Sequence, residues 1–297
     1  MKFLIIGAGG QLGRTVYKRL TQQGYEVATA VRAQLDLENP FNEDALDGVK
    51  FDAVINCAAV HSVDAIESDL AMTSSAYKVN AVAVEQLARM CDKRKAHFIH
   101  VSTDYVFGNI LPRGFDGKPR LHTEDMPTSP LSVYGTSKAK GEQLALSVGT
   151  SPVTIARVAG LFSYFHSSSK GPNFVDTMLQ KLRKGDTLKI VDDQLFSPTY
   201  AYDAACAIEH LARFRIPGIF HCSNSGYTSW FGLAAHAYHH SDIATGALEP
   251  CATLDRPRTA ARRPEWSAMD VSKLERYGFF MPHWTSAVRR HVSNGMF

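Results

Sequence analysis

The amino-acid sequence predicts an α/β fold, in which a doubly wound parallel sheet is accompanied by a smaller C-terminal part. Three observations lead to this fold class. Apolar runs of strand length alternate with amphipathic helical stretches through the first half of the chain. A glycine-rich turn joins the first such run to the first helical stretch. After Arg157 the periodicity becomes less regular, which sets the remainder of the chain apart.

The N-terminal stretch predicts a strand at Phe3 to Ile6, a glycine turn and a helix to about Gln23. The glycines at Gly7, Gly10 and Gly13 let the backbone turn tightly and come close to a pyrophosphate, which a helix N-terminus then stabilises. A strand, a glycine turn and a helix in this order are what a dinucleotide-binding Rossmann sheet requires. The alternative is a plain strand-to-helix turn.

The second strand, Glu26 to Val31, is followed by Arg32. Sites for NAD place an acid near this strand end, whereas sites for NADP place an arginine near the 2′-phosphate. Ala30 is not acidic, so NADPH is the favoured cofactor and NADH is kept as the alternative. The alternative interpretation is that Arg32 is a solvated surface charge without a role in cofactor binding. A loop beginning at Asp36 and Leu37 then leads to a short helix.

Further strands are predicted at Asp52 to Asn56 and at Phe98 to Val101, separated by a long helical stretch over about Ser74 to Lys93. The small residues that follow the first of these strands would allow a flat cofactor to lie against the backbone. The second strand ends in Ser102 and Thr103, and a hydroxyl there stands at the carboxyl edge of the sheet, where open α/β folds bind ligands.

Tyr134 and Lys138 lie four residues apart in a helix that Pro130 and Ser132 begin, so they share one helical face. An ammonium beside a phenol is expected to lower the phenol pKa, which makes a proton donor usable near neutral pH. The spacing of Tyr134 and Lys138 alone is weak evidence for a catalytic site. The glycine turn and the Ser-Thr strand end are what favour a catalytic interpretation.

The later chain predicts a strand at Val153 to Arg157, a polar loop at Ser163 to Pro172 and a helix from Asn173 to about Lys184. A loop at Asp192 to Thr199, a helix at Tyr202 to Arg213 and a strand at Gly218 to Cys222 follow. Three histidines share helical spacing, but no carboxylate or thiolate stands among them, so no metal site is expected. These are His236, His239 and His240.

Composition excludes several classes of protein. The 297 residues carry a net charge of only +3 without a basic stripe, so no nucleic-acid partner is expected. No stretch approaches transmembrane length, so no membrane partner is expected either. The cysteines are odd in number and lack a Cys-x-x-Cys pair, which favours reduced thiols in the cytoplasm over a disulfide framework or a zinc site. They are Cys57, Cys91, Cys206, Cys222 and Cys251.

Motifs along nearly the whole chain resemble the dTDP-4-dehydrorhamnose reductase family of extended short-chain dehydrogenases/reductases. In chain order they are Gly7 to Gly13, Ser102 to Phe107, Ser129 to Lys138, Gly141-Glu142, Asn173-Phe174, Asp193-Gln194, Ser197 to Thr199, Arg263-Pro264 and Ser272 to Leu274. The resemblance implies a dinucleotide-binding Rossmann domain over residues 1–160, completed by about 200–223. Residues 161–199 and 224–297 would form a mainly substrate-binding part.

The resemblance also implies an activity, the NADPH-dependent reduction of the C4 ketone of a nucleotide-diphosphate deoxysugar in dTDP-L-rhamnose synthesis. Thr103 would bond the ketone oxygen, Tyr134 would protonate it, and Lys138 would hold the nicotinamide ribose and tune Tyr134. The implied cofactor contacts are Gly7, Gly10, Gln11, Leu12, Gly13, Arg32, Asp36, Leu37, Ala59, Val60, His61, Tyr134 and Lys138. The implied substrate contacts are Thr103, Asp104, Tyr105, Gly160 and Asn173.

Two departures from the family pattern bear on the substrate and on assembly. Gly160 stands where the family has a tryptophan that packs on the substrate. The pocket is therefore expected to act poorly on the usual sugar or to accept bulkier or differently configured ones, unless Tyr164 or Phe165 restores the contact by folding over it. That loop, with His166 and Ser167 to Ser169, looks longer than usual. Arg14 and Thr15 replace an acid linked to a magnesium-bridged dimer, which leaves a homodimer open.

Two alternative functions remain at this point. A nucleotide-sugar dehydratase or epimerase shares the superfamily, but a dehydratase places a second carboxylate after the Asp, and here Tyr105 follows Asp104. A regulatory subunit of methionine adenosyltransferase would keep the fold and the cofactor. Co-purification with a larger catalytic partner would distinguish that role from an enzyme.

Overall fold

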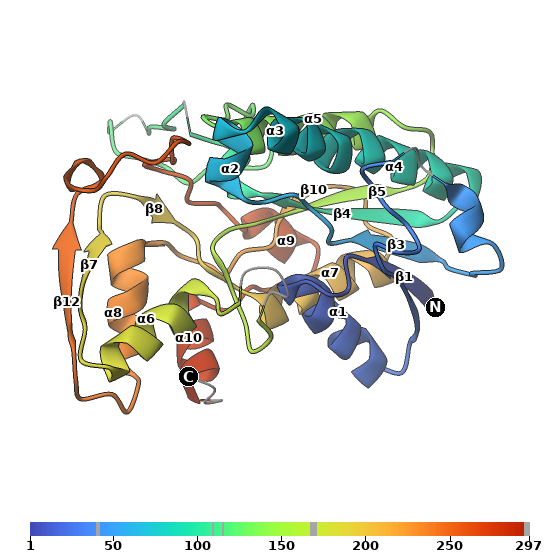
Figure 1. Cartoon of the computed structure of the whole chain (residues 1–297). Coiled ribbons are helices and arrows are strands. Elements are labelled where there is room, and N and C mark those ends of the chain that lie inside the picture. The colour runs from blue at the N-terminus through green and yellow to red at the C-terminus, as the bar shows by residue number, and fades with distance from the viewer. Residues whose placement is uncertain (40–41, 109, 115, 167–170, 294–297) are drawn as a thin grey trace.

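Six parallel strands form the central sheet of the computed structural model, which describes residues 1–39, 42–108, 110–114, 116–166 and 171–293 (Figure 1). From one edge to the other the strands are β2 (Glu26–Ala30), β1 (Lys2–Ile6), β3 (Ala53–Asn56), β4 (His97–Thr103), β5 (Val153–Val158) and β10 (Gly218–His221). The order reverses between β1 and β3, which is the point where such sheets bind ligands. The doubly wound parallel sheet predicted from the sequence is confirmed.

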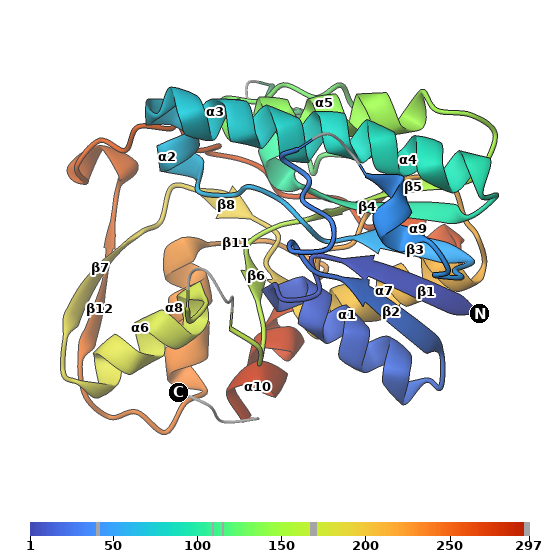
Figure 2. The same cartoon turned by 45° about the vertical axis from the view of Figure 1, so that its right-hand side comes forward.

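Helices cover both faces of this sheet, as Figures 1 and 2 show. Side chains alternate along β1, so Phe3 and Ile5 join the core beneath α1 (Gln11–Gln22) and α7 (Ala201–Arg213). Leu4 and Ile6 join the opposite core. That second core is covered by helices of the segment between β3 and β5, which are α2 (Val63–Ser68), α3 (Leu70–Tyr77), α4 (Ala83–Lys93) and α5 (Val133–Leu146).

The long helical stretch predicted before β4 begins earlier than expected and is not uniform. Asp69 ends α2 and caps α3, because its Oδ1 accepts a hydrogen bond from the backbone N–H of Ala71 at 2.8 Å. A π-helical segment, η2 (Lys78–Val82), joins α3 to α4. There α5 comes very close, since a Cβ on Gly141 would lie 2.0 Å from the carbonyl oxygen of Asn80. Only a glycine permits this approach.

The rest of the chain builds a second layer beside the carboxyl ends of the strands (Figure 1). Helices α6 (Phe174–Arg183), α8 (Trp230–His239) and α10 (Trp284–Ser293) contribute to a third core, which includes Val175, Leu233 and Val288. Short strand pairs accompany them. These are β7 (Thr187–Val191) with β12 (Ala247–Cys251), β6 (Leu161–Phe162) with β9 (Thr199–Tyr200), and β8 (Leu195–Phe196) with β11 (Thr228–Ser229).

Short helical turns complete the chain. They are η1 (Glu43–Leu46), η3 (Asp104–Val106), η4 (Thr253–Asp255) and α9 (Ser272–Arg276). Along the ranges described, no helix combines the length and the apolar character needed to cross a bilayer.

Two polar contacts to largely buried carboxylates fasten the C-terminal helix α10 to this framework. Arg290 donates two hydrogen bonds to the carboxylate of Asp203 on α7, at 2.8 and 2.6 Å. One residue further on, His291 lies 2.7 Å from Oδ1 of Asp176 on α6. Removing Arg290 should be destabilising, because the Asp203 carboxylate would stay buried without this charged partner.

Candidate active site

Thr103, Tyr134 and Lys138 meet at the carboxyl edge of β4. Thr103 is the last residue of that strand, and the other two lie on the first turns of α5. The helix begins where it does because Ser132 caps it, accepting a hydrogen bond from the backbone N–H of Gly135 at 3.2 Å. The side chain of Thr103 lies close enough to the Tyr134 phenol to favour its ionised form. The structure thus brings together the two hydroxyls that the sequence pattern singled out.

Lys138 is turned away from the Tyr134 hydroxyl toward β4. Its Nζ donates a hydrogen bond to the carbonyl oxygen of Val101 at 2.7 Å and lies 2.9 Å from Nε2 of His100. Burial raises the pKa of Tyr134 to about 12, opposed in part by the nearby side chain of Thr103. The expected lowering of this phenol pKa by the lysine is therefore not found in this arrangement. Burial also lowers the pKa of Lys138 to about 8.

Asp104 is held beneath the two hydroxyls. Its carboxylate accepts hydrogen bonds from Ser267 at 2.6 Å and from Thr103 at 3.1 Å. Burial raises the pKa of Asp104 to about 6, and the two hydroxyl donors oppose that shift. Tyr105 presents its ring to Tyr134 edge-on, with centroids 5.7 Å apart. Ser267, which lies 163 residues further along the chain, could not be found from sequence spacing.

The glycine turn before α1 has the shape of an anion site. Gly7 has a φ of +77°, and a Cβ on Gly13 would lie 2.2 Å from the carbonyl oxygen of Gly7, so both positions require glycine for the turn itself. A Cβ on Gly10 would lie 3.4 Å from its nearest described neighbour, the carbonyl oxygen of Gly7, so a methyl group would fit at this position. The first turn of α1 contains no acid and no side-chain cap.

One further observation at this turn fits a dinucleotide diphosphate. The Nε2 atom of Gln11 is buried and has no hydrogen-bond partner among the residues that the structure describes. A buried amide donor left in this way calls for an acceptor. Leu12, by contrast, packs into the core under the sheet, so only its backbone can face a ligand.

The segment from Ala59 to His61, expected to line the cofactor, is held by a residue that the sequence reasoning missed. Asn80 on η2 accepts a hydrogen bond from the N–H of Val60 at 3.0 Å and donates one to its carbonyl oxygen at 2.9 Å. Its amide nitrogen also donates to Ser137 on α5 at 3.0 Å. Asn80 is fully buried. A buried polar residue in an otherwise apolar helix segment is the one signal that the sequence offered.

Arg32 lies two residues beyond the end of β2, and its side chain is 72% exposed. It pairs with Glu38 at 3.1 Å and with Asp36 at 3.6 Å. Asp36 in turn accepts a hydrogen bond from the N–H of Glu38, so its carboxylate shapes this loop. Leu37 is buried in the core. Arg32 is thus near the predicted place for a 2′-phosphate, but two carboxylates already compete for it.

Gly160 has a φ of +45°, and Phe196 on β8 occupies the space beside it. The Phe196 ring lies 4.2 Å from that of Trp230 on α8. A small pocket at this place is lined by Asp104, Tyr105, Phe196, Trp230, Arg263 and Ser267, among others. An aromatic surface therefore reaches the pocket from β8 and α8. The sequence analysis placed Phe196 in a loop at Asp192 to Thr199 and assigned no role to it or to Trp230.

The loop that was expected to supply this surface lies elsewhere. The rings of Tyr164 and Phe165 each face Nζ of Lys18 on α1 at 5.6 Å, and Tyr164 is 41% exposed. Lys18 lies two turns beyond the start of α1. Closure of these two rings over the substrate is accordingly not found. Ser167 to Ser169 lie outside the described residues.

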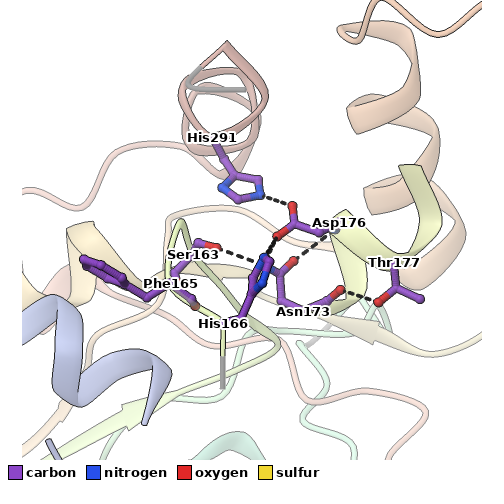
Figure 3. A network of polar contacts seen from close by, with 7 residues as sticks. All are labelled: Ser163, Phe165, His166, Asn173, Asp176, Thr177 and His291. Carbon is purple, nitrogen blue, oxygen red and sulfur yellow. Dashed lines mark hydrogen bonds and ion pairs between the residues drawn. The ribbon is translucent and has the colours of Figure 1, made fainter. Parts of the chain in front are cut away.

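Asn173 serves as the cap of α6 in a polar network (Figure 3). Its oxygen accepts a hydrogen bond from the N–H of Asp176 at 3.1 Å, and its nitrogen donates to that carboxylate at 2.7 Å and to the carbonyl oxygen of Ser163 at 2.9 Å. His166 and His291 approach the same carboxylate from two sides. The polar atoms of Asn173 are therefore engaged within the loop, and a substrate contact remains a prediction.

The histidines on α8 gather without forming a metal centre. The rings of His236 and His240 lie 4.5 Å apart, and those of His239 and His240 lie 5.0 Å apart. Within the described ranges, no group of three histidine, cysteine or acidic side chains is placed to hold a metal ion.

The parallel sheet, the glycine turn before α1 and the Tyr134–Lys138 pair on α5 define a short-chain dehydrogenase/reductase. Residues 1–296 match the model of the family described as RmlD substrate binding domain. The chain belongs to this family, that of the dTDP-4-dehydrorhamnose reductases, and is an oxidoreductase.

Relatives and solved structures agree with this assignment over the full length. A dTDP-4-dehydrorhamnose reductase of Aggregatibacter actinomycetemcomitans is 34% identical over 97% of each chain. The crystal structure of such a reductase from Clostridium acetobutylicum ATCC 824 has a TM-score of 0.88 at 31% identity, covering 99% of both chains. That of the Bacillus anthracis str. Ames reductase, in complex with NADP, has a TM-score of 0.87 at 28% identity and the same coverage.

Proposed function

We propose that the protein reduces the C4 ketone of a dTDP-linked 6-deoxy-4-ketohexose with NADPH, and that dTDP-4-dehydrorhamnose is this substrate. The observation that carries the proposal is the neighbouring position of Thr103 and Tyr134 at the carboxyl end of β4, with Lys138 one turn further along α5. Similarity to reductases of this name over nearly the whole chain supports the choice of sugar.

NADPH, when bound, supplies the hydride that attacks the ketone carbon. The open side of Gly10, the buried Gln11 amide and the N-terminus of α1 would hold its diphosphate. Arg32 would hold the 2′-phosphate after exchanging its carboxylate partners for it. The strip from Ala59 to His61, fixed by Asn80, would line the cofactor.

Tyr134 would then supply the proton. A phenol whose pKa is about 12 keeps its proton at neutral pH, so it is not lost to water before the reaction. As the hydride arrives, the ketone oxygen gains negative charge and becomes a strong base, which makes transfer from the Tyr134 hydroxyl favourable. Thr103 would turn its hydroxyl hydrogen from Asp104 to that oxygen, donate a second hydrogen bond and stabilise the developing charge.

Steady-state kinetics test the proposal. Consumption of NADPH is followed with dTDP-4-dehydrorhamnose, and the product sugar is identified by mass and by NMR. A specificity constant of about 10⁴ M⁻¹s⁻¹ or above is expected, as for an enzyme acting on its own substrate. No reduction of this sugar, together with tight binding to a larger catalytic partner, would replace the proposal with a regulatory role.

The unpaired state of all five cysteines supports a cytoplasmic location, where thiols stay reduced. The substrate would be the protein's main partner, with neither nucleic acid nor a membrane involved. A homodimer is the remaining open part of the proposal, and light scattering with and without magnesium tests it.

A further inference from the structure

A row of buried polar groups leads from the end of β3 to Lys138. Nζ of Lys138 lies 2.9 Å from Nε2 of His100 and 2.7 Å from the carbonyl oxygen of Val101. The other ring nitrogen of His100, Nδ1, lies 3.2 Å from Nδ2 of Asn56. Oδ1 of Asn56 accepts a hydrogen bond from the backbone N–H of Ala58 at 3.0 Å. The three side chains are at most 1% exposed.

The direction of each hydrogen bond in this row follows from its fixed end. A backbone N–H can only donate, so the oxygen of Asn56 faces Ala58 and the amide nitrogen faces His100. That nitrogen also only donates, so Nδ1 of His100 must accept. A neutral imidazole then carries its hydrogen on Nε2. The ring is neutral because burial, together with the charge that Lys138 can carry, holds the pKa of His100 well below its usual range.

The Nε2 hydrogen of His100 therefore points at Nζ of Lys138. An ammonium has three donors and no acceptor, so it would face a second donor there. An amine has a lone pair, and it can accept from His100 while donating to Val101. Turning the Asn56 amide over would only move the clash of donors to Ala58. Every group in the row is satisfied with the lysine uncharged.

We infer that Asn56 and His100 favour the uncharged amine of Lys138 before the cofactor binds, and that at alkaline pH binding of NADPH brings one proton from solvent onto Nζ. The second half rests on the proposed function. The ionised phosphates of NADPH favour a positive charge nearby, and ribose hydroxyls accept hydrogen bonds from an ammonium. His100 and Asn56 are thus positioning residues, which act on the reaction only through Lys138.

The charged and titratable groups around Lys138 leave it as the one that changes charge near pH 8. On its own helix, Tyr134 has a pKa of about 12, and after β3 that of Cys57 is also about 12. Asp104, at the end of β4, has a pKa of about 6. Glu142 is paired with Arg157 of β5 at 2.6 Å. The pKa of Lys138 itself is about 8, lowered mainly by burial and opposed by Glu142.

Proton uptake on NADPH binding is the direct measurement. Titration calorimetry in two buffers of different ionisation enthalpy, between about pH 7 and about pH 9, counts the protons; the 2′-phosphate, with a pKa of about 6, stays ionised there. Uptake is expected to approach one proton per NADPH at the upper end, while Kd rises about tenfold per pH unit above the free-enzyme pKa. Uptake near zero across the range would overturn the inference.

His100→Gln is the decisive variant, because an amide oxygen at the level of Nε2 can accept from an ammonium. The pH above which Kd rises should then move up by about one unit or more. His97→Gln is its matched control, since His97 is equally buried on β4 but bonds Thr154, at 2.7 Å, and should leave that pH unchanged. If His100 had a merely structural role, its variant would bind NADPH more weakly at every pH, and the pH above which Kd rises would not move.

Asn56→Asp tests the same row from its other end. A carboxylate at position 56 can accept a hydrogen bond from Nδ1 of His100, so the ring carries its hydrogen there. Nε2 is then free to accept from the Lys138 ammonium, and the pH above which Kd rises should again move up. The inference would be overturned if His100→Gln and Asn56→Asp both fold and the pH above which Kd rises is unchanged in them. If the enzyme reduces the ketosugar normally but its NADPH affinity does not depend on pH, only the inference about Lys138 is overturned. If NADPH does not bind at any pH, the proposed function is overturned as well.

Discussion

Phe196 occupies the space into which a side chain at position 160 would extend, since a Cβ on Gly160 would lie 2.2 Å from Cε2 of the Phe196 ring. The left-handed backbone of Gly160, with a φ of +45°, further disfavours any other residue there. The two positions are therefore coupled. Where the family pattern has an aromatic residue after β5, this chain brings Phe196 and Trp230 to the same pocket from β8 and α8.

Gly160→Trp should consequently destabilise the protein by about 1–3 kcal/mol, the usual cost of overpacking a closed site. The double change Gly160→Trp with Phe196→Gly removes the clash but keeps the backbone strain, so part of this loss should be regained. Chemical denaturation of the two single variants and the double variant gives the coupling energy. Strictly additive effects would show that the two positions do not share one space.

Gly10→Ala and Gly13→Ala should separate cofactor binding from folding. The Gly10 side is open, so its variant should keep the melting temperature of the wild type but bind NADPH at least about tenfold more weakly, because the added methyl stands where the diphosphate would approach. The Gly13 Cβ would meet a backbone oxygen at 2.2 Å, so that variant should lose stability first. Thermal denaturation and NADPH titration check both. Unchanged NADPH affinity in Gly10→Ala would remove this turn from the cofactor site.

Arg32→Ala should weaken NADPH much more than NADH, because only NADPH loses a charge-assisted contact to its 2′-phosphate. Glu38→Gln should do the opposite and tighten NADPH, since it frees Arg32 from its 3.1 Å partner. The measurement is Kd for both cofactors at one ionic strength, because exposed charges are screened by salt. Equal losses for NADH and NADPH in Arg32→Ala would show that this side chain does not read the phosphate.

Tyr134→Phe should lower kcat by about two to four powers of ten, the range for loss of a general acid, while NADPH still binds. The ring keeps its edge contact with Tyr105, so the fold should be intact. Lys138→Ala should impair both turnover and NADPH binding. Single-turnover kinetics isolate the chemical step. Near-normal turnover in Tyr134→Phe would transfer the role of proton donor to another group.

Asp104 should make stability depend on pH in a defined direction. Its pKa is raised from 3.8 to about 6 on folding, so its contribution is fully present below about pH 4 and is lost as the pH rises through 6. Two pKa units correspond to about 3 kcal/mol. The readout is the difference between the wild type and Asp104→Asn, because the buried histidines, whose pKa values are lowered, contribute alike to both. A pH-independent difference would contradict the buried carboxylate.

The sheet and the hydroxyls of Thr103 and Tyr134 were predictable because they depend on local sequence. The glycine turn, the strand end at Thr103 and the spacing from Tyr134 to Lys138 are each contained within a few residues. The predicted effect of Lys138 on the phenol pKa is not found in this arrangement, since spacing places two residues on one helical face but does not say which neighbour across the sheet a flexible side chain prefers.

The remainder of the site depends on contacts between distant segments. Ser267 reaches Asp104, and Asn80 fixes Val60, through tertiary packing that no periodicity encodes. Strands β7 and β12 were not predicted, because they pair in parallel across about sixty residues and their exposure does not alternate cleanly. Phe196 was overlooked for a related reason: its effect appears only opposite Gly160.

The arrangement of α1 beneath α7 has a consequence for synthesis on the ribosome. Leu12, Val16 and Leu20 of α1 are covered by residues of α7, and β10, which completes the sheet, ends at His221. At about 5–20 residues per second, that cover emerges on the order of 10–40 s after α1. During this interval the apolar face of α1 lacks the part of its cover that α7 supplies. Fragments that end before α7 should therefore aggregate or engage chaperones, whereas the full-length chain should bury this face when its last third arrives.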